Sequence, residues 1–279
     1  MDAATVVSCG SLTRLGRAWQ NERHRRLARH FRLLGGSRGI LTALETELPR
    51  SSSHCTAAPS ERSRKPDSMY TLYYSPGTAS MCVHQALIEA NAQYRLVLVD
   101  LQAGQQRDPA YLRLNPGGVV PTLLIDDAPF TETAALLMTV ATRHPETRLA
   151  PAESSASRAA WYQWIVYLAN TLQPAFRLWF YPADVSDDPD TQAILNAATC
   201  RKIESVWARI DAHLLAKGPY LLGAEFSAAD LMLIMLMRWS RNMPRPATEW
   251  PALHQYAARM KARPSWKKLY ALEGLSEWS

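Results

Sequence analysis

Three hydroxyl side chains lie around the point where the first helix of the main body is predicted to begin. Ser75, Thr78 and Ser80 belong to the run SPGTAS at 75–80, which follows a short aromatic stretch typical of a strand. A hydroxyl can donate a hydrogen bond, and the first turn of a helix has backbone N–H groups without helical partners. Together they can hold an anion such as a thiolate. The competing interpretation is structural, because Ser and Thr are also common N-cap residues.

Two further residue pairs occupy positions where backbone groups can bind a ligand. Val120-Pro121 enters a predicted strand, and Glu132-Thr133 opens a predicted helix whose free N–H groups attract a carboxylate. Each pair also has an ordinary explanation. A proline can simply begin a strand, and an acidic first turn stabilises any helix.

Metal and nucleotide chemistry have no support in the sequence. The four cysteines form no close pair, and His84, His144, His213 and His254 are scattered without a partner at ligand spacing. Gly117-Gly118 lacks both the Walker lysine and the three-glycine dinucleotide pattern. We therefore expect neither a metal nor a bound nucleotide.

The elements that must position these residues alternate between strand and helix up to about residue 150. The pattern predicts strands at 70–74, 96–99, 121–125 and 129–131, and helices at 81–92, 109–114 and 133–144. Beyond residue 151 helical periodicity dominates, including helices at 227–238, 251–262 and 264–272. This order is that of an α/β thioredoxin-like N-terminal domain (69–150) followed by an all-α helical-bundle C-terminal domain (151–279).

The first 68 residues differ from the rest in charge and texture. They hold 12 Lys and Arg against 6 Asp and Glu, whereas residues 69–279 hold 19 of each. We interpret 1–68 as a basic, disordered extension, with a targeting segment or a polyanion-binding arm as alternatives. A nucleic-acid or membrane-surface role driven by this extension would show steep salt dependence. The neutral body gives no reason to expect nucleic acid, no apolar run is long enough for a membrane span, and the cysteine usage favours the cytoplasm.

Four segments in order resemble the glutathione S-transferase family, in particular its bacterial cytosolic members. They are YYSPGTAS at 73–80, NPGGVVPTL at 115–123, Glu132-Thr133, and GAEFSAAD at 223–230, which resembles the family's folding signature. The resemblance covers residues 69–279. It implies a homodimeric detoxification enzyme that binds glutathione as co-substrate, ionises its thiol, and directs it at a small hydrophobic electrophile. Ser227 and Asp230 in the last segment are a capping-box pattern, which we assign to folding.

The resemblance also assigns roles to single residues. Thr78 is the first choice for thiol activation because it directly follows Pro76-Gly77, and Ser80 and Ser75 are its rivals. In the family the bond before the proline matching Pro121 is cis, and the backbone of Val120 pairs with the cysteinyl part of glutathione. Glu132 and Thr133 are matched to the γ-glutamyl group, and Asn170 to a position that reaches across the dimer.

The chain departs from its bacterial relatives at three positions. Ala79 stands where some of them carry a reactive cysteine, Gln173 where they carry a histidine, and Val119 where a polar side chain often holds glutathione. Cys82, inside the first helix, reads as a buried small residue. These departures leave two other interpretations open: a glutathione-dependent isomerase or peroxidase on the same fold, and a non-catalytic binding protein.

The second substrate is expected between the two domains. Aromatic residues of the helical part can line an apolar pocket there, namely Tyr167, Phe176, Trp179 and Phe180. Their identity does not define the electrophile beyond its being small and apolar.

Overall fold

Four short strands form a mixed sheet in the order β2-β1-β3-β4. The computed structural model describes residues 70–278, so the predictions made for residues 1–68 lie outside the described part of the chain. β1 runs parallel to β2 and antiparallel to β3, and β3 is antiparallel to β4. β2 begins two residues earlier than the periodicity predicts, because Tyr94 pairs with the first residue of β1. The strands are β1 (Tyr70–Tyr74), β2 (Tyr94–Leu98), β3 (Thr122–Ile125) and β4 (Ala128–Phe130).

The register of this sheet places three loop segments at the same end. Tyr73 of β1 is opposite Thr122 of β3, so the end of β1 lies beside the start of β3. Leu123 is opposite Phe130, so β4 also ends there. The β3–β4 turn that allows this has positive φ at both Asp126 (53°) and Asp127 (65°), as a type I′ hairpin requires. The segments after β1, before β3 and after β4 are therefore neighbours.

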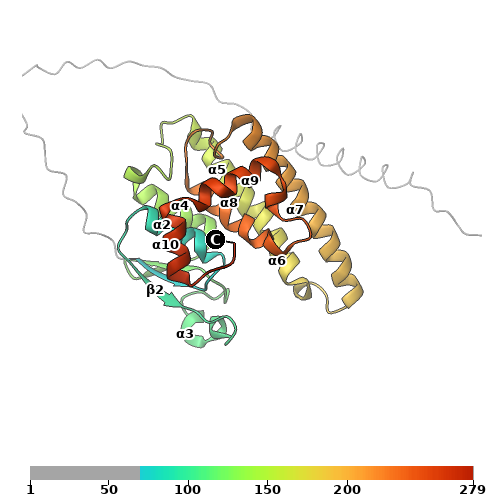
Figure 1. The fold of residues 1–279 in the computed structure, drawn as a ribbon. Helices are drawn as coiled ribbons and strands as arrows, with labels where there is room; N and C mark the ends of the chain where they lie inside the picture. Colours follow the sequence, from blue (N-terminus) through green and yellow to red (C-terminus); the bar gives the residue numbers. More distant parts are fainter. Residues whose placement is uncertain (1–69, 279) are drawn as a thin grey trace, which may run out of the picture. The chain divides into compact units, whose positions relative to one another are not determined.

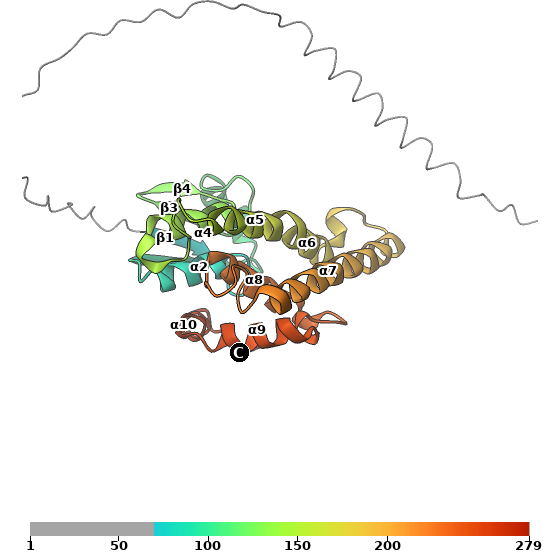
Figure 2. The same ribbon diagram turned by 90° about the horizontal axis from the view of Figure 1, so that it is seen from above.

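Helices α2 (Ser80–Glu89) and α4 (Thr133–Arg143) pack together and connect the sheet to the helical part, and α3 (Pro109–Leu112) lies in the β2–β3 connection. All of α2 from Ser80 to Leu87 is buried, because the sheet, α4, α8 and α10 surround it. Figures 1 and 2 show α10 beside α2, although the two helices are far apart in the sequence.

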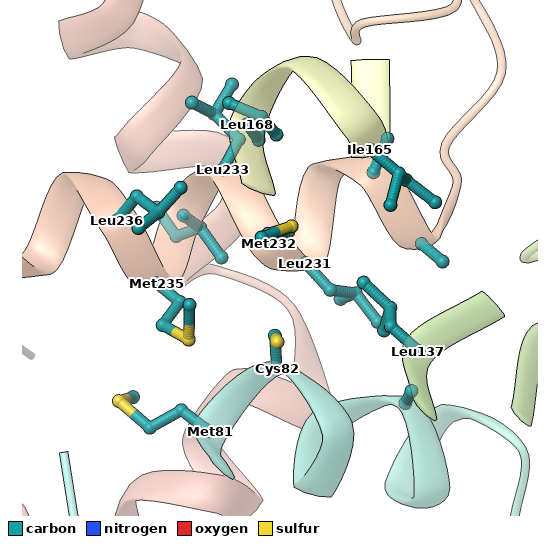
Figure 3. Packing of buried hydrophobic residues seen from close by; sticks show 14 of the residues in the cluster. Met81, Cys82, Leu137, Ile165, Leu168, Leu231, Met232, Leu233, Met235 and Leu236 are labelled. Carbon is teal, nitrogen blue, oxygen red and sulfur yellow. The ribbon is translucent and has the colours of Figure 1, made fainter. Parts of the chain in front are cut away.

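The remainder of the described chain is helical, which confirms the predicted order of a thioredoxin-like domain followed by a helical bundle. α8 is its central helix, with every residue from Ala228 to Arg238 buried. Figure 3 shows Met81 and Cys82 of α2 pointing toward α8 residues such as Met235 and Leu231. The helices are α5 (Ser157–Tyr167), α6 (Gln173–Phe180), α7 (Pro189–Lys217), α8 (Ala228–Trp239), α9 (Pro251–Lys261) and α10 (Pro264–Glu273).

The predicted capping box is present at the start of α8. Asp230 accepts hydrogen bonds from the Ser227 N–H (2.8 Å), the Leu221 N–H (3.0 Å) and the Tyr256 hydroxyl (3.1 Å). Desolvation by burial raises the pKa of Asp230 to about 6, although all these hydrogen bonds act in the opposite direction. The motif thus ties α8 to α9 and to the segment before it.

A π-helical turn, η3 (Leu168–Leu172), joins α5 to α6. Pro174 follows it and has no N–H to donate to the carbonyl of Asn170, and its ring would collide with that carbonyl in a regular α-helix. The turn widens instead, so the Gln173 N–H bonds to the Leu168 carbonyl five residues back. None of the helices in residues 70–278 combines the length and apolar character needed to cross a membrane.

Candidate functional site

The three hydroxyl residues form one hydrogen-bonded group at the β1–α2 junction. The Thr78 hydroxyl donates to the Ser75 carbonyl over 2.7 Å and lies 2.9 Å from the Ser80 hydroxyl. The Ser80 hydroxyl also reaches the Ser75 carbonyl, at 3.1 Å. Ser80 is fully buried and Ser75 nearly so, whereas Thr78 is half-buried. Thr78 is therefore the hydroxyl best placed to meet a ligand.

The helix that follows does not use these hydroxyls as its N-cap. Its N-cap residue is Ala79, which makes no side-chain capping bond, and the Ser80 N–H meets the Thr78 hydroxyl oxygen only at 3.4 Å. Within residues 70–278 the Ala79 N–H has no hydrogen-bond partner. A half-buried hydroxyl and a free backbone donor thus lie side by side at the start of a ten-residue helix.

The second segment presents the peptide groups of Val120. The Val120–Pro121 bond is cis, as the family resemblance implies. Val120 is partly exposed, and neither its N–H nor its C=O is hydrogen-bonded to another described residue. The preceding carbonyl of Val119 is held by the Tyr111 hydroxyl (2.6 Å) and the Asn115 side-chain amide (2.7 Å), which fix the loop. An extended ligand can pair with Val120 as an additional strand does.

The third segment is the start of α4. Glu132 has φ +68° and ψ 106°, an uncommon conformation for a residue other than glycine, and its side chain is exposed. Thr133 is 7% exposed, and within the described residues its hydroxyl makes no hydrogen bond. Because β4 ends at the same edge as β1, both residues lie near the Thr78 loop, as the sequence motifs anticipate.

A feature that sequence reasoning missed is how tightly the C-terminal part holds Gly77. The Gly77 N–H donates to Glu273 Oε2 of α10 (3.0 Å), and the Gly77 carbonyl accepts from Trp239 Nε1 of α8 (3.0 Å). Arg238 packs against the same residue, since a Cβ at Gly77 would lie 2.9 Å from Arg238 Nη1. With φ at +73°, Gly77 is strained for any other residue, so both conformation and space require glycine here.

Glu273 also links this loop to a buried histidine. Its Oε1 lies 2.8 Å from His84 Nδ1, and both side chains are completely buried. His84 Nε2 lies 3.3 Å from the Tyr94 hydroxyl on β2. His84, which showed no partner in the sequence, thus pairs with a residue 189 positions away. The sequence signal that could have indicated a buried Glu273 is its position on the same face of α10 as the apolar residues Leu269 and Tyr270.

The predicted electrophile residues fall into two groups. Phe176 and Phe180 of α6 lie within ring-contact distance of each other and of Trp239, and Trp179 contacts Phe180. Phe176 is buried, whereas Phe180 is 42% exposed. Through Trp239 this aromatic group reaches the Gly77 carbonyl and hence the Thr78 loop.

Tyr167 lies in a different aromatic group. Its ring contacts Trp164, and the Arg209 guanidinium from α7 stacks over it at 4.6 Å. Asn170, in the π turn, is exposed, and Gln173 beside it is half-buried. A cavity of about 950 Å³ lies elsewhere, lined by Pro145, Arg148, Arg158 and Phe226 among others, and contains none of these residues.

Within the described residues, neither Cys82 nor a cluster of metal ligands adds reactive groups to this site. Burial raises the pKa of the Cys82 thiol to about 12, which matches an inert core residue. Within residues 70–278 no group of three or more His, Cys, Asp or Glu side chains could hold a metal ion.

Comparisons with known proteins agree with this arrangement. The family described as Glutathione S-transferase, N-terminal domain, matches residues 68–139, and the one described as Glutathione S-transferase, C-terminal domain, matches residues 192–259. Glutathione S-transferase GST-4.5 of Xanthomonas campestris pv. campestris is 32% identical over 206 residues, covering 74% of this chain and 99% of that relative. The chain therefore belongs to the glutathione S-transferase family.

Two other similar proteins bear on function. A solved structure of a glutathione transferase homologue from Sulfitobacter, with bound glutathione, has a TM-score of 0.69 and 31% identity, and the match covers 75% of this chain and 99% of that one. The disulfide-bond oxidoreductase YfcG of Escherichia coli (strain K12) is 26% identical, over 71% of this chain and 92% of its own length.

Proposed function

We propose that this chain is a glutathione transferase in which Thr78 stabilises the thiolate of bound glutathione. The observation that supports this most is the pair of donors at the start of α2: the half-buried Thr78 hydroxyl, which donates to the Ser75 carbonyl in this structure, and the Ala79 N–H, which has no partner within the described residues. A free thiol with a pKa of about 8.5 is only about 3% ionised at pH 7, and lowering that pKa to about 6.5 raises the ionised fraction to about 75%. Two hydrogen bonds at a helix N-terminus act in that direction.

The hydrogen bonds among Ser75, Thr78 and Ser80 allow the Thr78 hydroxyl to turn toward a ligand. Thr78 donates to the Ser75 carbonyl, but the buried Ser80 hydroxyl reaches the same carbonyl. When the Thr78 O–H rotates toward a thiolate, Ser80 keeps the Ser75 carbonyl hydrogen-bonded. Activation therefore leaves no buried acceptor without a donor.

The remaining parts of glutathione have matching groups at the same end of the sheet. Val120 can pair through its backbone with the cysteinyl residue beside cis Pro121. The N-terminus of α4 and the Thr133 hydroxyl suit the γ-glutamyl carboxylate, and the Glu132 carboxylate suits the ammonium group. Val119 is 48% exposed and adds no polar contact, which weakens binding relative to a polar side chain.

The thiolate would attack a small apolar electrophile held against the aromatic group of α6 and α8. Its sulfur forms a bond to the electrophilic carbon while a leaving group departs with the bonding electrons, so conjugation balances without another reactant. Phe180 is the exposed member of that aromatic group and is our first choice for contact with the electrophile, followed by Trp179. Tyr167, in its separate group, is a candidate for a second wall of the pocket.

The test of function is conjugation by the full chain of a chloronitrobenzene to glutathione, followed by product analysis. We expect a thioether product and chloride, with turnover reduced about 100-fold in Thr78→Ala, as for loss of one hydrogen-bond donor to a reacting anion. The Thr139→Ala variant is the matched control, because Thr139 lies on the far part of α4 and bonds only its own helix. Binding of glutathione without any turnover would favour a non-catalytic protein.

A second candidate reaction is favoured by the similarity to a disulfide-bond oxidoreductase. A thiolate held by Thr78 could attack a disulfide, which gives a mixed disulfide and releases a thiolate, or a hydroperoxide, which gives glutathione sulfenic acid and releases an alcohol. A second glutathione would then displace the remaining thiol or water and form glutathione disulfide. An isomerase would return an unconjugated product. Offering the chain a disulfide, a hydroperoxide and an isomerisable substrate in parallel, with product analysis, separates these reactions from conjugation.

We also propose that the chain forms a homodimer and is located in the cytoplasm. Each subunit would consist of a thioredoxin-like domain at 69–150 and a helical domain at 151–279. Exposed apolar side chains on β4 and on one face of α5, Phe130, Tyr162 and Val166, support a subunit interface. Asn170 follows Val166 by four residues and can reach a partner from the same face. Light scattering should give a dimer mass for the full chain and a lower mass for Val166→Glu, with Leu215→Glu, exposed on α7, as control.

A further inference from the structure

The buried guanidinium of Arg238 adjoins the loop that would hold the glutathione thiol. Arg238 is 4% exposed, and its Nη1 occupies the space where a side chain of Gly77 would begin. Thr78, the hydroxyl residue of the proposed thiol site, directly follows Gly77 in the chain. A fully buried charge is costly unless something compensates for it, so its neighbours decide what it does there.

No described carboxylate forms a direct ion pair with Arg238, although Glu273 contacts the same Gly77. Arg238 Nε donates to the Tyr270 hydroxyl over 2.9 Å, and among residues 70–278 no carboxylate oxygen lies within 4.0 Å of the Arg238 nitrogens. Burial raises the pKa of Tyr270, so that hydroxyl stays protonated and supplies no negative charge. It donates onward to the backbone carbonyls of Glu277 and Trp278.

The other charged groups nearby are occupied by different partners. Glu273 uses one oxygen for the Gly77 N–H and the other for His84. Arg241, one turn along the chain, pairs with Glu277 at 3.1 Å. Burial also raises the pKa of Tyr74, which keeps it neutral.

We propose that Arg238 is a positioning residue of the thiol site: it holds Gly77 in place and supplies the positive charge that favours ionised glutathione beside Thr78. This inference rests on the proposed function and adds a charge to its two hydrogen-bond donors. A Cβ on Gly77 would lie 2.9 Å from Arg238 Nη1. The Cα of Thr78 is about 3.8 Å from that of Gly77, so a thiolate held by the Thr78 side chain would lie roughly 6 to 9 Å from the guanidinium. At an effective dielectric constant of about 20, that separation lowers a thiol pKa by about one to two units.

The bound thiolate would in turn supply the anion that Arg238 lacks. Ionisation of the thiol and binding of glutathione are thermodynamically linked. A charge that lowers the thiol pKa therefore also makes the protein bind ionised glutathione more tightly than protonated glutathione. Charge removal should therefore change the pH dependence of binding and turnover, whereas a purely structural defect would lower both at every pH.

The experiment compares Arg238→Lys, Arg238→Met and the control Arg241→Met in the full chain. The pKa of glutathione bound to each variant is measured from the thiolate absorbance near 240 nm, and the pH profile of kcat/KM is recorded in parallel. We expect Arg238→Met to raise the thiol pKa by at least one unit and to move the profile equally. Arg238→Lys should keep most of the wild-type value, and Arg241→Met should leave it unchanged.

An unshifted thiol pKa in Arg238→Met, or equal shifts in the Lys and Met variants, would overturn the proposal. If Arg238→Met does not fold, as judged by circular dichroism, Arg238→Gln provides the same test, because its amide can still bond the Tyr270 hydroxyl. Failure of the proposed function looks different: wild-type protein would then bind no glutathione, or bind it with the ordinary thiol pKa.

Discussion

Replacing Glu273 should destabilise the protein more than replacing any exposed carboxylate of the same segment. Its side chain is completely buried and satisfies both the Gly77 N–H and His84 Nδ1. Glu273→Ala leaves the half-buried Gly77 N–H and the buried His84 Nδ1 without a partner, and each such group costs about 1 to 3 kcal/mol. We therefore expect a loss of about 3 kcal/mol in the free energy of unfolding.

The isosteric change Glu273→Gln should cost less, about 1 kcal/mol. The amide oxygen can still accept from the Gly77 N–H, and the amide nitrogen can donate to His84 if Nδ1 is unprotonated. His84 Nε2–H then points to the Tyr94 hydroxyl, which lies 3.3 Å away. The graded effect of the two substitutions reports on the hydrogen bonds and not merely on charge.

Equilibrium unfolding in urea, followed by tryptophan fluorescence at fixed protein concentration, measures these losses. Glu277→Gln is the control, because the Glu277 side chain is 70% exposed and pairs with Arg241. Its loss should stay below about 0.5 kcal/mol. A cost for Glu273→Ala below about 1 kcal/mol, or equal to that of the control, would refute the structural role of the Gly77 contact.

Two further predictions concern buried ionisable groups. The pKa of Asp230 is raised to about 6 by burial, so the folded state binds its proton more tightly than the unfolded chain does. Protonation of Asp230 therefore adds about 3 kcal/mol to the free energy of unfolding. This gain is complete only below about pH 4 and is lost as the pH rises through about 6. Stability measured from pH 7 to pH 4 should rise by most of that amount, roughly 2 kcal/mol, relative to Asp230→Asn, and parallel pH curves would contradict the assignment. Cys82, with a pKa of about 12, should escape iodoacetamide in the native protein at pH 8 and react only after denaturation, as mapped by mass spectrometry; labelling of Cys82 in the folded protein within minutes would contradict its burial.

Local sequence patterns predicted most of the helices and strands and the residues that would contact glutathione directly. The hydroxyls at 75–80, the Val120-Pro121 pair and Glu132-Thr133 are contiguous motifs, and each lies beside a short strand that composition and flanking turn residues predict. The capping box at Ser227 was equally legible, since its partners are three residues apart.

The contacts that hold the β1–α2 loop at Gly77 could not be predicted from the sequence, because they join residues far apart in the chain. Glu273 and Trp239 reach Gly77 across 196 and 162 positions, and nothing local distinguishes either from an ordinary helix residue. The π turn before Pro174 was missed for another reason. Helical periodicity continues through it, and one extra residue in a turn changes the hydrophobic stripe little.

The most direct test of the central claim is an ultraviolet titration of glutathione bound to the full chain and to Thr78→Ala. We predict a bound thiol pKa at least one unit below the free value, rising by about one unit or more in the variant. A lowered pKa that does not change in the variant would assign the role to Ser80, Ser75 or the helix terminus. Saturable binding with an unshifted thiol pKa in the wild-type protein would contradict thiol activation altogether.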